Sequence, residues 1–254
     1  MKSIADIKAE LKLCKPEEPA ALEAFLEEYR EDERAGVQAL VKSAEKLREK
    51  YQAELKRTEN MSAYERQYAE YGYICGIDEV GRGPLAGPVV ACAVILDPKG
   101  QILYLNDSKQ LSSKKREELY GIITEKALAY GLGFVDNNRI DEINILQATY
   151  EAMRQAIQKL KIKPDILLND AVTIPGVDIR QVPIIKGDAK SVSIAAASIV
   201  AKVTRDRWMV EIAEQYPQYD FAGNKGYGSA KHIEALKRFG PTPLHRKTFI
   251  SNFC

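Results

Sequence analysis

Cysteine, histidine and long apolar runs are scarce in this sequence, and each shortage excludes a class of protein. The 254 residues include four cysteines and two histidines. The cysteines form no Cys-x-x-Cys pair, and Cys75 and Cys92 stand in apolar runs typical of buried strands, so we expect reduced core thiols rather than disulfides. No apolar run approaches the length of a membrane span, and acids stand where a signal peptide would be apolar. We therefore expect a cytoplasmic protein without membrane contact.

Charge is nearly balanced overall but unevenly distributed. The net charge is +1, with 45% hydrophobic and 29% charged residues, as in an ordinary globular protein. Residues 1–72 carry 13 Lys and Arg against 16 Asp and Glu, whereas residues 73–254 carry 24 against 20. Between Lys225 and Lys247 six basic residues face one acid, Glu234. This excess would suit a polyanion, although a solvated basic tail is the plainer interpretation. A monomer is the default expectation.

Residues 1–71 are predicted to form a helical accessory region. Ser3 with Asp6 can cap a first helix, which Pro16 and Pro19 end. Two helical stripes follow, at Leu22, Phe25, Leu26 and Tyr29, and at Val37, Leu40, Val41 and Leu47. The charged segment 54–71 is predicted to be a linker or connecting helix. A binding role and a purely structural role are equally open for this region.

Residues 72–254 have the alternating pattern of an α/β protein. We predict strands at 73–78, 89–96, 102–105, 131–135, 165–169 and 182–185, and helices at 112–130, 139–144, 145–160, 191–215 and 230–239. A hairpin-like start followed by alternating elements predicts a mixed sheet flanked by helices, with a helical extension before it and a helical segment after it.

The most informative stretch is residues 73–90. A short apolar strand runs into Asp78 and Glu79, and a turn with Gly81, Arg82 and Gly83 follows. Paired acids beside open glycine backbone suit a divalent metal and a closely approaching phosphate backbone. An acidic pair alone is more often a solvated turn, but the attached Gly-Arg-Gly favours a site.

Two further acids, Asp170 and Asp188, follow predicted strands. Ligands of open α/β sheets gather at the carboxyl ends of the strands, where all four acids would meet. Each acid taken singly is more often a helix cap. Four converging carboxylates would repel one another unless divalent cations lay between them, and oxygen ligands favour Mg²⁺ or Mn²⁺ over zinc. Two such ions about 4 Å apart can hydrolyse a phosphodiester. We expect Asp78 to bridge the ions and Glu79 to lie nearest the substrate, which requires the strand to end or twist there.

Several ordered motifs resemble those of bacterial ribonuclease HII, the type 2 ribonuclease H family. They are DEVGRGPLAGPVV at 78–90, NDSKQLS at 106–112, KGDAKS at 186–191, AAASIVAKVTRDR at 195–207 and GYGS at 226–229. The resemblance implies a ribonuclease H-like fold and cleavage of RNA in RNA/DNA hybrids. It also implies incision of duplex DNA at embedded ribonucleotides, leaving 3′-hydroxyl and 5′-phosphate ends. Arg82 and the helical extension favour this group over the related ribonuclease HIII group.

The resemblance also implies roles for individual residues. Asp78, Glu79, Asp170 and Asp188 would be the four catalytic, metal-binding acids. The Gly81-Arg82-Gly83 turn would recognise the ribose 2′-hydroxyl, and Tyr227 would contact the sugar at the RNA–DNA junction. Candidates for phosphate contact are Lys109, Lys190, Lys202, Lys225, Arg246 and Lys247. For each, a solvated surface role is the alternative.

The two histidines, His232 and His245, are judged too far apart for a zinc pair, and neither is assigned as a base. The segment from His245 to Phe249 is instead expected to anchor the C-terminal part near the substrate. Two other functions stay open, a nuclease of this fold that needs several consecutive ribonucleotides and a nucleic-acid-binding module without catalysis.

Overall fold

The computed structural model describes residues 2–253 and contains two compact units, residues 1–60 and 61–254. In the part of the chain that is described, no helix is both long and apolar enough to cross a membrane.

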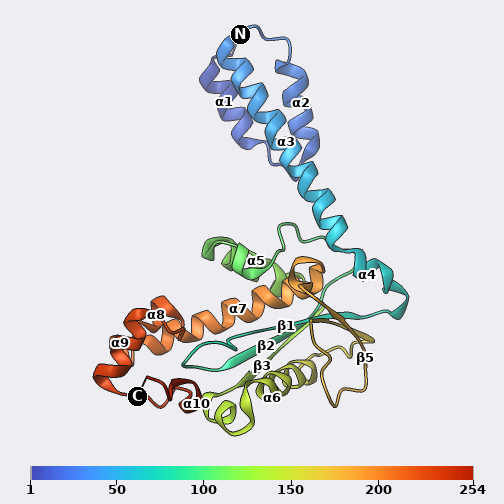
Figure 1. The fold of residues 1–254 in the computed structure, drawn as a ribbon. Coiled ribbons are helices and arrows are strands. Elements are labelled where there is room, and N and C mark those ends of the chain that lie inside the picture. The colour runs from blue at the N-terminus through green and yellow to red at the C-terminus, as the bar shows by residue number, and fades with distance from the viewer. Residues whose placement is uncertain (1, 254) are drawn as a thin grey trace. The chain divides into compact units, whose positions relative to one another are not determined.

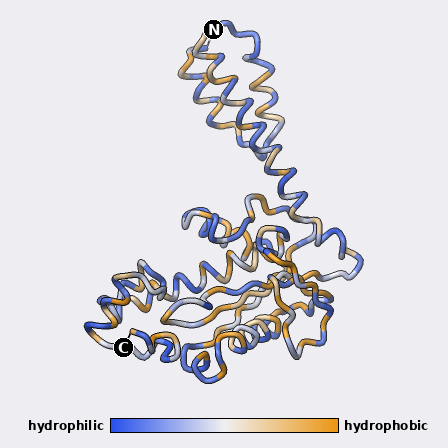
Figure 2. Tube along the Cα trace, in the orientation of Figure 1, coloured by the Kyte–Doolittle hydropathy of each residue, from blue (hydrophilic) through white to orange (hydrophobic). Residues whose placement is uncertain are grey.

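The first unit consists of three helices around a small apolar core. They are α1 (Ile4–Leu13), α2 (Pro19–Tyr29) and α3 (Ala35–Met61). Ser3 and Asp6 form a reciprocal capping box at the start of α1, as predicted. The core contains the predicted stripes, with Ile7, Leu22, Phe25, Leu26, Tyr29, Val37, Val41 and Ala44 buried. Figure 2 shows the resulting alternation of hydrophobic and hydrophilic residues along these helices.

The predicted connecting segment is helical, and its last part is held by the second unit. After α3 comes α4 (Ala63–Gln67), whose Glu65 accepts hydrogen bonds from Ser191 Oγ at 2.5 Å and from the Ser193 amide at 3.0 Å. Tyr64 and Tyr68 pack against the apolar cluster at the outer strands. Residues just beyond the unit boundary therefore cap a helix of the sheet domain.

The second unit is built on one five-stranded mixed sheet. Its strands are β1 (Ile74–Val80), β2 (Val89–Ile95), β3 (Ala129–Val135), β4 (Ile166–Asp170) and β5 (Arg180–Ile184). They lie in the order β3-β2-β1-β4-β5 (Figure 1). The first three pair antiparallel as a meander, whereas β4 and β5 run parallel to β1.

Helices cover both faces of this sheet (Figure 1). On one face α6 (Asn137–Gln158) packs against alternate residues of the central strands, and on the other α7 (Val192–Ala213) and α5 (Ser113–Lys126) do so. The contact with α7 is very close, because a Cβ atom on Gly76 of β1 would lie 2.1 Å from the Ser193 carbonyl carbon. The Ala195–Ala197 run keeps the facing surface of α7 equally small.

The C-terminal part forms a helical subregion with its own apolar cluster. It contains α8 (Phe221–Asn224), α9 (Ala230–Phe239) and α10 (Lys247–Ile250). Tyr219 and Phe221 stack with ring centroids 5.5 Å apart beneath α9. This subregion adjoins the end of α7.

One predicted element was wrong, and the end of another was misplaced. Residues 102–105 form no strand, because the chain turns there with Tyr104 at a φ of 66°, although Ile102 and Leu105 are buried as their apolar character indicates. The predicted helix 112–130 ends at Lys126, and β3 begins at Ala129. The two adjoining helices predicted at 139–160 form α6, in which Asn144 has a non-helical backbone.

Candidate active site

A cavity of about 540 Å³ opens where β1 ends. It brings together several of the predicted site residues from four separate parts of the chain. Its lining consists of Asp78, Glu79, Val80, Gly81, Arg82, Gly83, Ser108, Lys109, Ser198, Lys202 and Tyr227.

Asp78 and Glu79 both line this cavity although they are adjacent on a strand. Asp78 is 6% exposed, and its Oδ1 accepts a hydrogen bond from the Glu79 amide at 2.8 Å. Burial raises the pKa of Asp78 well above its ordinary value, and the charges of Glu79 and Asp170 raise it further, while a hydrogen bond with Ser198 opposes the rise. Burial also raises the pKa of Glu79, and Arg82 opposes it through a contact of 3.2 Å. Burial thus disfavours the ionised form of both acids.

Asp170 and Asp188 lie beside the cavity rather than in its lining. Asp170 ends β4, and its Oδ1 accepts a hydrogen bond from the Gly187 amide at 2.7 Å, next to Asp188. Burial raises the pKa of Asp188, followed by the charges of Asp107 and Asp170. The charge of Asp170 acts on Asp78 and Glu79 as well. The four predicted acids therefore form one electrostatic cluster.

Asp107 belongs to this cluster and was missed by the sequence reasoning. Its charge raises the pKa of Asp188, and its carboxyl accepts a hydrogen bond from the Lys109 amide at 2.9 Å. Ser108 and Ser198, whose hydroxyls lie 3.0 Å apart, were missed too. Asp107 and Ser108 lie within the quoted NDSKQLS run, but only the lysine of that run was assigned.

The donor chemistry of the cluster fits a divalent cation. Carboxylate oxygens are the ligands that Mg²⁺ and Mn²⁺ take, and the carboxyl groups lie near enough to one another that their charges, after burial, raise the pKa values of Asp78 and Asp188. Among residues 2–253, however, no three His, Cys, Asp or Glu side chains are placed so that they could hold an ion by themselves. An ion here would need water or phosphate oxygens to complete its coordination, as Mg²⁺ commonly does.

The glycine-rich turn after β1 is held from beneath by two buried arginines. Gly81 and Gly87 have φ values of 88° and 86°, which side-chain-bearing residues rarely adopt. Arg246 is completely buried and donates hydrogen bonds to the carbonyls of Gly81, Arg82 and Gly87. Arg205, also fully buried, donates to the carbonyls of Ala86 and Pro88. The expectation that Arg246 contacts phosphate was therefore wrong, because its donors are used inside the protein.

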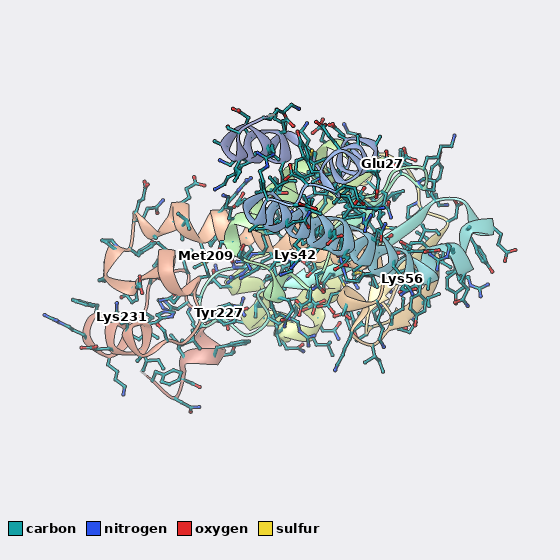
Figure 3. All side chains as sticks on the ribbon, turned by 90° about the horizontal axis from the view of Figure 1, so that it is seen from above. Glu27, Lys42, Lys56, Met209, Tyr227 and Lys231 are labelled. Carbon is teal, nitrogen blue, oxygen red and sulfur yellow. The ribbon has the colours of Figure 1, made fainter. Side chains whose placement is uncertain are left out.

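Tyr227 stands across the cavity from this turn. Its side chain is 42% exposed, and a Cβ atom on Gly83 would lie 3.9 Å from its ring. Figure 3 shows Tyr227 with Met209 and Lys231 in the C-terminal part of the second unit. An aromatic ring and an open glycine backbone thus face one space.

The predicted lysines differ in position. Lys109 and Lys202 line the cavity, and Lys202 Nζ lies 2.9 Å from Asp206 and 6.0 Å from the Tyr227 ring centroid. Lys225 instead lines a second cavity of about 480 Å³ between α5 and α7. Lys190 and Lys247 are exposed outside the lining of the first cavity. Only two of these lysines are thus gathered around Asp78.

His232 and His245 are in direct contact, so the judgement that they are far apart was wrong. Their Nε2 atoms lie 2.9 Å apart, both side chains being buried. His232 Nδ1 lies 2.8 Å from the Tyr227 carbonyl and must donate, whereas His245 Nδ1 accepts from the Thr242 amide at 2.9 Å. The backbone partners thereby assign both tautomers, and His245 Nε2–H donates to His232. We call this chain from Thr242 to Tyr227 the histidine relay.

The histidine relay should make the protein less stable in mild acid. Burial and the neighbouring His232 lower the pKa of His245 to about 4, from an ordinary value of 6.5. The unfolded chain binds this proton more readily than the folded protein does, so protonation favours unfolding. The free energy of unfolding is therefore highest above pH 6.5 and falls by no more than about 3 kcal/mol as the pH is lowered toward 4. Urea unfolding at several pH values checks this. In His245→Gln the free energy of unfolding should depend less on pH between 6.5 and 4. The same pH dependence as in the wild type would contradict the expectation.

The sequence as a whole matches a known family. A family model described as Ribonuclease HII matches residues 75–252, and one described as Ribonuclease HII N-terminal domain matches residues 3–69. The chain belongs to the ribonuclease HII family. The ribonuclease HII of Lachnoclostridium phytofermentans is 65% identical over 226 residues, which cover 89% of each chain. The predicted family, and the choice of group HII over HIII, are thus confirmed.

Solved structures support the same fold. The crystal structure of ribonuclease H2 from Pyrococcus horikoshii OT3 is 30% identical with a TM-score of 0.57, over 69% of this chain and 92% of that one. The crystal structure of Bst-RNase HIII in complex with Mn²⁺ is 19% identical with a TM-score of 0.52, over 65% and 61%, and supports the fold alone. The ribonuclease H-like fold class is confirmed, and the protein is an endoribonuclease of the ribonuclease H type.

Proposed function

We propose that this ribonuclease HII is metal-dependent, cleaves the RNA strand of RNA/DNA hybrids, and incises duplex DNA on the 5′ side of single embedded ribonucleotides. The products would carry 3′-hydroxyl and 5′-phosphate ends. Ribonucleotide removal and RNA primer removal are the tasks this chemistry would serve. One observation carries the proposal, since buried Asp78 and partly buried Glu79 share a cavity with an open glycine turn and Tyr227.

The acids would bind the metal and leave the rest of its coordination to the substrate. Asp78, Glu79, Asp170 and Asp188 supply oxygen donors for Mg²⁺ or Mn²⁺, in one or two positions. A bound ion would supply charge that activates a water and stabilises the leaving oxygen. Lys109 would contribute a fixed positive charge, because burial would lower its pKa but the carboxylates of Asp107, Asp78 and Asp188 raise it.

The turn and Tyr227 would select the sugar. Distinguishing RNA from DNA requires contact with the 2′-hydroxyl, which both donates and accepts hydrogen bonds. The amides beside Gly81 and Gly83 can approach it because no side chain blocks them. The ring of Tyr227 would lie against the next sugar, and Lys202 beside it would contact a phosphate.

The direct test is incision of a DNA duplex containing one ribonucleotide, with Mg²⁺, Mn²⁺ or EDTA. Cleavage 5′ to the ribonucleotide that EDTA abolishes would support the proposal. Cleavage of a continuous RNA/DNA hybrid without incision at the single ribonucleotide would instead indicate a nuclease that needs several consecutive ribonucleotides. Metal-independent binding without any turnover would indicate a binding module. Cytoplasmic location, a monomeric state and nucleic acid as a partner stay predictions.

The first 71 residues are proposed to add affinity for the duplex as an accessory region. A deletion tests this role only if it leaves the second unit intact, so the residue at which it ends matters. A chain lacking residues 1–60 should keep the stability of the second unit, whereas one lacking residues 1–72 should lose about 2 kcal/mol or more, because Glu65 and the two tyrosines that pack with it are removed. Thermal unfolding of both checks this. Unchanged KM and duplex binding in the shorter deletion would remove the affinity role.

A further inference from the structure

Two buried residues of the C-terminal segment connect the two structures that face the sugar. His245 is 2% exposed and Arg246 is fully buried, and neither lines the cavity. Their backbone pairs with the glycine turn, since Ala86 and His245 form an isolated antiparallel bridge and the Arg246 amide donates to the Leu85 carbonyl at 2.8 Å. The side chains then extend in two directions.

The side chain of Arg246 determines the direction of the peptide groups in the turn. Its Nη2 lies 2.5 Å from the Gly81 carbonyl and its Nη1 lies 2.8 Å from the Arg82 carbonyl. In a planar trans peptide the carbonyl and the following amide point in opposite directions. A guanidinium that holds these two carbonyls inward therefore holds the amides of Arg82 and Gly83 outward. A cation on the carbonyl side also strengthens each amide as a donor.

The side chain of His245 acts on Tyr227 through the histidine relay. The Thr242 amide, His245 and His232 form a continuous chain of hydrogen bonds that ends at the Tyr227 carbonyl. A second connection joins the same loops directly, because the Leu85 amide donates to the Gly226 carbonyl at 2.8 Å. Arg205 adds a third, from Lys225 to Ala86.

We propose that His245 and Arg246 are positioning residues. They hold the amides of the Gly81–Gly83 turn and the ring of Tyr227 in fixed positions relative to each other, so that a ribose and the sugar beside it are recognised together. This inference rests on the proposed function, in which those two elements contact the sugars. Both loops contain residues with positive φ and would otherwise sample several conformations. Pre-arranging them lowers the entropic cost of aligning the substrate.

The relay can be tested with a matched pair of variants. His245→Gln keeps an amide donor near the position of Nε2 and so keeps the bond to His232, whereas the side-chain amide of His245→Asn is too short to reach His232. We expect His245→Asn to lower kcat/KM for the duplex with one ribonucleotide by about 10-fold to 100-fold, and His245→Gln to retain most of it. Equal losses in both variants would overturn the relay.

A double-mutant cycle separates positioning from a general structural role. If His245 acts through Tyr227, then His245→Asn should have little further effect on kcat/KM in a Tyr227→Ala background. Additive losses would overturn the inference. Hydrogen exchange of the amides of residues 226–229 should rise in His245→Asn and not in His245→Gln, and this readout does not require turnover.

Arg246 is tested by binding rather than by rate. In a background carrying Asp78→Asn, the ratio of Kd values for all-DNA and ribonucleotide-containing duplexes measures recognition of the 2′-hydroxyl. Arg246→Lys keeps the charge but cannot span the carbonyls, and should lower that ratio by about 10-fold. The same change at exposed Arg238 is the control. An unchanged ratio in a folded Arg246→Lys protein would overturn the inference. Absence of incision by the wild-type protein would instead remove the proposed function first.

Discussion

Asp78→Asn should abolish turnover while leaving duplex binding in place. The substitution removes one charge from the most buried acid of the cluster and keeps its shape and its acceptor for the Glu79 amide. Loss of a buried group that would bind the metal should lower kcat by about 10³-fold or more. Single-turnover cleavage with Mg²⁺ and a parallel binding measurement check both halves of this expectation.

The same variant should be at least as stable as the wild type without metal. Burial and the charges of Glu79 and Asp170 raise the pKa of Asp78, so the ionised carboxylate is a destabilising group in the metal-free protein. Asp97→Asn, in an exposed loop away from the cavity, provides the matched control and should change neither property. A large loss of stability in Asp78→Asn would show that this carboxylate is structural, and near-normal turnover would remove it from the chemistry.

Gly76→Ala should be strongly destabilising although it adds only one methyl group. A Cβ atom at this position would lie 2.1 Å from the Ser193 carbonyl carbon and 2.3 Å from its oxygen, and both belong to the main chain of α7. Since a backbone cannot move as a side-chain tip can, the helix would have to shift from the sheet, at a cost of about 3 kcal/mol. Urea unfolding measures this free energy.

The control for this prediction is a glycine that lies in a helix and has free space around it. Gly121 lies on α5 with nothing within 4 Å of an added Cβ, so Gly121→Ala should stabilise the protein by about 0.5 to 1 kcal/mol. Because α7 carries Ser198 and Lys202 into the cavity, folded Gly76→Ala protein should also lose activity. Equal stability of the two variants would contradict the close packing of α7 on β1.

Local patterns in the sequence were sufficient for much of the fold and for part of the site. The apolar runs of β1 and β2 and the small-residue helix α7 were recognised because each pattern is continuous along the chain. The four-residue run at 102–105 was misjudged because so short an apolar segment fits a buried turn as well as a strand. Asp78 and Glu79 were assigned to one site because the motif that contains them is specific.

The contacts that were missed join residues far apart in the sequence. Arg246 stands in a basic run and resembles a phosphate ligand, and only the fold brings the carbonyls of Gly81 and Gly87 around it. His232 and His245 meet because α9 and the segment after it fold back on each other. Asp107 approaches Asp188 across different parts of the unit. Burial of polar groups depends on such tertiary contacts, which no local pattern encodes.

The position of His245 and Arg246 in the chain has a consequence for biosynthesis. A polypeptide leaves the ribosome from its N-terminus, and domains fold as their segments emerge. Asp78, Glu79 and the glycine turn appear early, with β1, whereas the arginine that braces this turn is translated after all five strands. The nascent chain therefore carries both acids and the turn before the arginine that holds the turn has been made.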